Sequence, residues 1–89
     1  MYLSGAQIRA GRALVRWSAG ELAKRAKLGR ITVTRAEAVD GKTSLTEANS
    51  HAIQQALERS GVEFISENGG GAGVRMKTPQ SSAMGGTEA

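Results

Sequence analysis

The sequence predicts a mainly α domain, a bundle of four to five short helices with a C-terminal β-hairpin or β-arm. Apolar residues recur at helical spacing as far as residue 60. Polar residues with the pattern of helix caps precede these stretches. A run of glycines near the C-terminus separates two β-type segments. A single domain of 89 residues buries only about 60 to 65% of its unfolded surface, so a partner subunit would add stability.

The first helix is expected over residues 4–16. Ser4 and Gln7 have the spacing of a capping pair at its start. Trp17 follows the helix directly, and we expect it to pack at the corner with the next helix rather than stack on a nucleic-acid base. The helical spacing indicates the core residues Ile8, Leu14 and Val15.

Residues 18–38 predict two short helices joined by a tight turn at residues 27–29. Ser18 and Glu21 have the form of a capping box, in which the hydroxyl binds the backbone of Glu21 and the carboxylate reaches back to Ser18. Small and apolar residues then form one stripe, which lets another helix cross closely: Leu22, Ala23 and Ala26. This arrangement predicts a helix-turn-helix that binds DNA.

The second of these helices, residues 30–38, has two contrasting faces on a helical wheel of about 100° per residue. Its inward side holds Val33, Ala36 and Glu37. Its outward side carries no acidic residue and suits a major groove, where arginine reads guanine and an apolar group meets a thymine methyl. The alternative is an ordinary solvated face with an exposed isoleucine. The residues predicted to bind DNA on this helix are Arg30, Ile31, Thr32, Thr34 and Arg35, with Ser18 at the start of the preceding helix.

A loop over residues 39–44 follows, and Lys42 and Thr43 within it are candidates for phosphate contacts. Thr46 is expected to cap a further helix that runs to Ser60 and ends before Gly61. Its spacing predicts the inward residues Ile53, Ala56, Leu57 and Ser60 and leaves His51 outward, as a surface residue rather than a zinc ligand.

Residues 61–68 followed by 69–77 have the pattern of a strand, a glycine turn and a second strand. A phosphate-binding loop would need a following helix and a Lys-Ser/Thr pair, which this glycine run lacks. We therefore interpret the segment as a dimerisation element, with its strands paired either within one chain or between two. The apolar residues expected to assemble the dimer are Val62, Phe64, Ile65 and Val74. Residues 78–89 have the composition of a disordered tail.

Charge and composition narrow the classes of function. Residues 9–42 hold nine basic and three acidic residues, whereas the rest of the chain holds three basic and five acidic residues, and the net charge is +4. Such clustering is typical of a surface that binds phosphates, although solvated lysine and arginine side chains would give the same count. The chain has no cysteine, a single histidine and no recognisable pair of carboxylates. We therefore expect that it is not an enzyme and that it holds no metal or other cofactor. No apolar run approaches the ~20 residues of a membrane span, so we expect a cytoplasmic protein without membrane contact.

The segment that predicts the helix-turn-helix resembles the Cro and phage-repressor type, often called the Xre family. The matching residues are Ala23 in the first helix, Leu28 in the turn and Val33 in the recognition helix. The resemblance also implies a lambda-repressor-like helix-turn-helix bundle in which Arg12 pairs with Glu37. Lys27 departs from the glycine that is usual in the turn, and Ala19 from a DNA-contacting glutamine.

These features predict a transcriptional regulator, more specifically a repressor, that binds an inverted repeat in double-stranded DNA as a homodimer. Residues 1–61 would form the DNA-binding domain and residues 62–77 the dimerisation extension. The alternative is a protein-interaction module of the same fold, an antiactivator or antitoxin that captures a regulatory protein partner. Binding to genomic DNA fragments separates the two.

Overall fold

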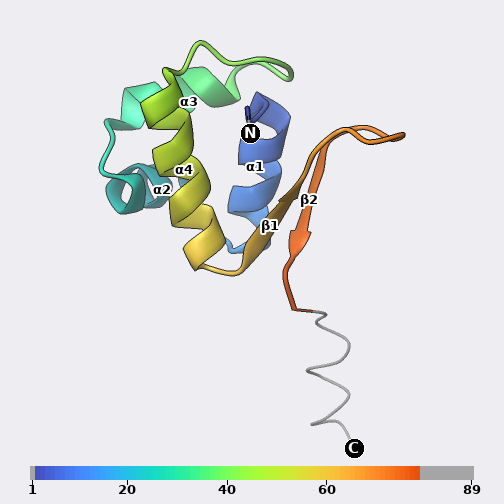
Figure 1. Ribbon diagram of the computed structural model, residues 1–89. Helices are drawn as coiled ribbons and strands as arrows, with labels where there is room; N and C mark the ends of the chain where they lie inside the picture. Colours follow the sequence, from blue (N-terminus) through green and yellow to red (C-terminus); the bar gives the residue numbers. More distant parts are fainter. Residues whose placement is uncertain (1, 79–89) are drawn as a thin grey trace, which may run out of the picture.

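The computed structural model describes residues 2–78 and is mainly α, with four helices and a two-stranded antiparallel hairpin among these residues. The hairpin lies on the α1 side of the helices, beside α1 and α4 (Figure 1). The predicted C-terminal tail, apart from its first residue, falls outside the described residues. The elements are α1 (Gly5–Leu14), α2 (Ala19–Ala26), α3 (Arg30–Glu37), α4 (Glu47–Arg59), β1 (Val62–Ile65) and β2 (Gly73–Met76).

Side chains cap α1 and α4 as predicted. The Ser4 hydroxyl accepts a hydrogen bond from the Gln7 amide at 3.1 Å, and the Gln7 side chain accepts one from the Ser4 amide at 2.9 Å. At α4, the Thr46 hydroxyl accepts from the Asn49 amide at 3.1 Å. The two hydroxyl groups each satisfy a first-turn amide that has no partner within its helix, which explains where α1 and α4 begin.

The predicted capping box of α2 forms only in part. The Ser18 hydroxyl accepts from the Glu21 amide at 3.0 Å, but the Glu21 carboxylate accepts from Arg25 Nε at 2.7 Å instead of reaching back to Ser18. A guanidinium one turn along the helix offers a charged donor, which a carboxylate prefers to a neutral amide. The same hydrogen bond lowers the pKa of Glu21.

The first helix ends at Leu14, two residues earlier than predicted, and Arg16 takes a left-handed conformation with φ of 59°. Leu14 was expected in the core but is exposed. Leu57 and Phe64 approach α1 at Gly11, where both lie within 4 Å of the position that a Cβ would occupy. The core therefore closes against α1 one turn before Leu14.

The apolar core is one cluster that draws on all four helices and on β1. Val62 and Phe64, which alternate along β1, are only 2% and 7% exposed. Gly61, with φ of 101°, turns the chain at the end of α4 so that β1 runs back over the helices. The residues with nearly complete burial are Leu3, Ile8, Leu22, Val33, Ile53, Leu57 and Val62.

The burial of β1 corrects the prediction that its apolar residues assemble a dimer. Strand β1 pairs with β2 in the same chain, with Phe64 opposite Val74. Val62 and Phe64 are covered by the chain's own helices and cannot meet a second subunit. Ile65 and Val74 are half-buried, so part of each remains accessible.

Replacing Phe64 with alanine measures this contribution to the core. We expect Phe64→Ala to lower the free energy of unfolding by about 3 to 5 kcal/mol, because it removes a buried ring and leaves a cavity beside Gly11. Urea denaturation at several protein concentrations gives the result. If the loss of stability occurred only at concentrations where the wild type is a dimer, Phe64 would act between subunits.

Gln7 connects the start of α1 to the hairpin. Its side-chain amide donates to the carbonyl of Ile65 at 3.3 Å and to that of Gly73 at 3.1 Å, while its oxygen completes the Ser4 cap. One buried side chain thus satisfies backbone groups at the last residue of β1 and the first residue of β2. The hairpin is held to the helices by hydrogen bonds as well as by its apolar side chains.

Candidate nucleic-acid interface

Helix α3 is placed by its contacts with α2 and by the turn between them. Its inward side buries Val33, Ala36 and Glu37, and α2 buries Leu22, Ala23 and Ala26. In the turn, Lys27 is left-handed with φ of 59° and ψ of 43°, and the Leu28 amide donates to the Ala23 carbonyl at 2.9 Å. This conformation costs a residue with a Cβ about 1 to 2 kcal/mol. It lets the chain reverse within three residues.

The structure brings Arg12 and Glu37 together as the family resemblance implies. Arg12 Nε and Nη2 donate to the two carboxylate oxygens of Glu37, each at 2.8 Å, and Nη1 donates to the carbonyl of Trp17 at 2.9 Å. The hydrogen bond to Glu37 is the main reason that the pKa of Arg12 is raised. Glu37 is 8% exposed and Arg12 is 26% exposed. The pair ties α1 to the last residue of α3.

Arg9 is a second residue of α1 that holds α3 in place, and it was not among the residues predicted from the sequence to do so. Its guanidinium donates to the carbonyls of Glu37 and Val39 and to the Asp40 carboxylate, the last at 2.6 Å. Arg9 stands three residues before Arg12 on the same face of α1, and that spacing was a usable signal. A cation at the C-terminal end of a helix also interacts favourably with the helix dipole. Both arginines therefore hold the C-terminal end of α3 from α1.

The outward face of α3 is exposed along its length. Arg30, Ile31, Thr34 and Arg35 are exposed, with Ile31 at 65%, and Thr32 is half-buried. The Thr34 hydroxyl donates to the carbonyl of Ile31 at 3.1 Å. Within residues 2–78, neither arginine has an acidic partner at ion-pair distance. The face thus offers two guanidinium groups, hydroxyl groups and one large apolar side chain to a ligand.

Of the two loop residues predicted to contact phosphate, Lys42 is exposed and Thr43 is buried. Lys42 is exposed, and its ammonium lies 5.3 Å from the centre of the Tyr2 ring. Thr43 is only 4% exposed, and its hydroxyl accepts from the Leu45 amide at 3.3 Å. The Thr43 hydroxyl closes a local turn toward α4, so the prediction that Thr43 contacts phosphate is wrong.

Ser18 is exposed at the start of α2, where its hydroxyl already accepts the Glu21 amide. It keeps a hydroxyl proton to donate to a phosphate oxygen. Trp17 next to it packs against the core, and the Arg25 guanidinium lies 4.7 Å from its ring centre. These contacts agree with a packing role for Trp17 at the corner between α1 and α2.

Three of the nine basic residues in the 9–42 segment pair with acidic residues, namely Arg9, Arg12 and Arg25. Two of these pairs serve the placement of α3 and the third lies on α2. The remaining six have no acidic partner in the described part of the chain: Arg16, Lys24, Lys27, Arg30, Arg35 and Lys42. Their positive charge is available to a phosphate backbone.

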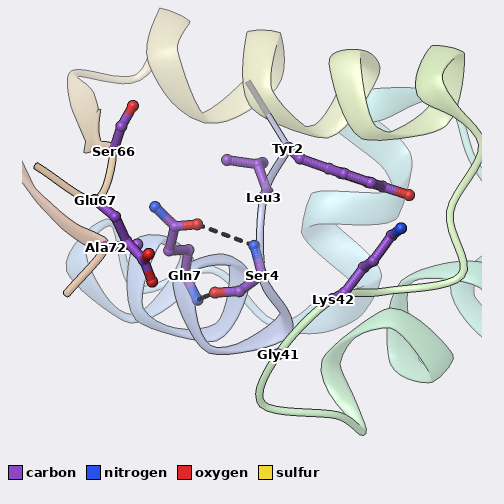
Figure 2. Close-up of a pocket in the computed structure, with 9 residues that line it drawn as sticks. All are labelled: Tyr2, Leu3, Ser4, Gln7, Gly41, Lys42, Ser66, Glu67 and Ala72. Carbon is purple, nitrogen blue, oxygen red and sulfur yellow. Dashed lines mark hydrogen bonds between the residues drawn. The ribbon is translucent and has the colours of Figure 1, made fainter.

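A shallow cleft of about 410 Å³ lies between the N-terminal segment, the loop after α3 and the hairpin loop. Figure 2 shows Lys42 and Glu67 on opposite sides of the cleft, and the Gln7 side-chain oxygen accepting a hydrogen bond from the Ser4 amide. The cleft could not be predicted from local sequence patterns, because three segments that are distant in the chain line it. Its lining residues are Tyr2, Leu3, Ser4, Gln7, Gly41, Lys42, Ser66, Glu67 and Ala72.

No protein-family model matches the chain, and no curated protein matches it significantly. Across residues 2–78, no helix is long and apolar enough to cross a membrane. The same residues contain no group of three or more histidine, aspartate or glutamate side chains that could hold a metal ion.

Proposed function

We propose that the chain is a sequence-specific regulator of transcription that binds double-stranded DNA, with α2 and α3 as a helix-turn-helix and α3 as the recognition helix. The observation that carries this proposal is the division of α3 into a buried side and an exposed side without acidic residues. Glu37, the one acidic residue of α3, is turned inward and neutralised by Arg12. A major groove admits such a helix with its exposed side toward the base edges.

The arrangement of the helices supports the finer proposal of a lambda-repressor-like fold. Residues 18–38 resemble the Cro and phage-repressor type, and the bidentate contact between Arg12 and Glu37 is the one that this resemblance implies. Arg30, Ile31, Thr34 and Arg35 are then the candidates for base and groove contacts. Ser18 and Lys42 are the candidates for phosphate contacts, on either side of α3 in the chain.

A single recognition helix reads one half-site, so we further propose that two copies bind an inverted repeat and repress transcription by covering it. Two half-sites on one side of the duplex lie about 34 Å apart. Val62 and Phe64 are no longer candidates for the contact between the copies. The half-buried Ile65 and Val74 remain candidates on the hairpin.

Replacement of Arg35 tests base recognition by α3. With an operator selected by the full chain from random duplexes, we expect Arg35→Ala to weaken specific binding by about 1 to 3 kcal/mol and to relax the preference at one base pair. Fluorescence anisotropy with the operator and its single-base variants measures both effects. The physical reason is the loss of a guanidinium that donates two hydrogen bonds to a guanine.

Lys42→Ala is the matched control, because it removes one exposed positive charge from the loop and none from α3. This substitution should weaken binding to all DNA sequences alike and reduce the slope of log affinity against log salt by about one. If Arg35→Ala left operator and random DNA bound with wild-type affinities, α3 would not be the reading element. If the wild type bound no duplex at all, the same exposed face would belong to a protein-interaction module.

A further inference from the structure

Three helices are followed within two residues by a residue with positive φ, and that residue differs from one helix to the next. Helix α4 ends at Arg59 and is followed two residues later by Gly61, with φ of 101°, which tolerates this conformation because it has no Cβ. Helix α2 ends at Lys27 with φ of 59°, and α1 is followed by Arg16 with the same φ. The chain therefore keeps a strained backbone conformation at Lys27, where glycine would relieve the strain.

The helix dipole does not account for a lysine at this position. The last turn of α2 holds Lys24 and Arg25, and although Arg25 is paired with Glu21, Lys24 has no acidic partner in the described residues, so a further cation adds little to the interaction with the C-terminal carbonyls. Arg16 differs, because the basic residue in the last turn of α1 is Arg12, whose charge is neutralised by Glu37. The dipole gives a reason for Arg16 and leaves Lys27 unexplained.

The surroundings of Lys27 leave its ammonium group free to bind an anion. The side chain is exposed, and no acidic group of residues 2–78 lies within ion-pair distance. Leu28 beside it packs against the core, and its amide bonds to Ala23, so the backbone of the turn is held in place. Lys27 stands three residues before Arg30, the first residue of α3. Strain held at a well-anchored position often marks a functional side chain.

We infer that Lys27 is a phosphate-binding residue, whose ammonium contacts the DNA backbone beside the groove that α3 enters. The inference rests on the proposed function, because the N-terminal residues of a recognition helix point into the groove and the preceding turn then lies next to the backbone. A lysine on a flexible stem suits a single phosphate oxygen and carries no base preference. The strained turn thus places a charge where glycine would place none.

The test is Lys27→Gly in the full chain, with a random-sequence DNA duplex as the probe and anisotropy titrations over a range of salt concentrations. We expect thermal stability to rise and DNA binding to weaken. The midpoint of thermal unfolding rises by about 4 °C, because glycine accepts the left-handed conformation. The slope of log affinity against log salt falls by about 0.9, which corresponds to roughly eightfold weaker binding at about 0.1 M salt.

Two further variants separate a phosphate contact from a general effect of charge. Arg59→Ala removes one exposed positive charge from the last residue of α4, which lies outside the helix-turn-helix, and should leave the salt slope at the wild-type value. Lys27→Arg keeps the charge and should restore the slope without the gain in thermal stability.

The outcomes distinguish the inference from the proposed function. If the wild type binds the duplex and Lys27→Gly has an unchanged slope, or one that falls no more than that of Arg59→Ala, Lys27 does not contact phosphate. If Lys27→Gly is no more stable than the wild type, the left-handed conformation at Lys27 is not strained and gives no reason to assign a function to this side chain. If the wild type does not bind the duplex, the proposed function itself is wrong.

Discussion

We expect Gly5→Ala to destabilise the protein by at least about 3 kcal/mol, although alanine is the better helix former. A Cβ at Gly5 would lie 1.8 Å from the carbonyl oxygen of Val39 and 2.6 Å from that of Ala36. Backbone atoms cannot move aside as a flexible side chain can. The first turn of α1 would have to separate from the segment after α3, which would break the hydrogen bond from the Gly5 amide to the Gly41 carbonyl.

Gly41→Ala is the matched control on the other side of this contact. A Cβ at Gly41 meets no atom within 4 Å, so we expect a change within about 0.5 kcal/mol. Thermal unfolding followed by circular dichroism compares the two variants. Equal stability of Gly5→Ala and the wild type would mean that α1 does not pack this closely against the end of α3.

The second large effect is expected at the ion pair between α1 and α3. Arg12→Met should lower the free energy of unfolding by about 3 to 5 kcal/mol, because it leaves the carboxylate of Glu37 buried without a charged partner. It also removes the hydrogen bond to the Trp17 carbonyl. Urea denaturation at neutral pH measures the loss.

Glu37→Gln should cost less than Arg12→Met, by a clear margin. The glutamine keeps an oxygen that accepts from Arg12, and the Arg12 side chain is 26% exposed, so water solvates the unpaired guanidinium in part. The double variant should recover part of the loss seen in Arg12→Met, since it removes the isolated buried charge. Purely additive effects of the two substitutions would show that the pair does not interact in solution.

The two anchors of α3 also connect stability to the proposed recognition. Arg9 and Arg12 both reach from α1 to the C-terminal end of α3, where Glu37 is the last helical residue. These contacts set how α3 projects from the domain. Because neither arginine lies on the outward face of α3, their roles are structural. With Arg25 also paired, six basic residues of the 9–42 segment have no acidic partner among the described residues and are available to a phosphate backbone.

Local chemistry allowed the sequence to predict most of the helices. Ser4 with Gln7, and Thr46 with Asn49, form their caps within one helical turn, so their geometry needs no distant partner. The two faces of α3 follow in the same way from the helical period, which placed Val33 inward and Ile31 outward. The boundary at Ser60 and Gly61 was equally readable, because glycine is suited to the left-handed turn that ends a helix.

Only the tertiary structure decided which residues outside these periodic stretches are buried. Phe64 belongs to the core because Gly61 sends β1 back over α1 and α4, and a four-residue strand cannot reveal which surface will cover it. Thr43 is shielded from solvent, and its hydroxyl accepts a hydrogen bond from the Leu45 amide in a local turn. Gly5 is the clearest example of a residue that only the tertiary structure explains. Helix propensity favours alanine at this position, but the carbonyls of Ala36 and Val39 leave no room for a Cβ. Caps and periodicity act within one turn of helix, but burial depends on segments that meet only after the chain has folded.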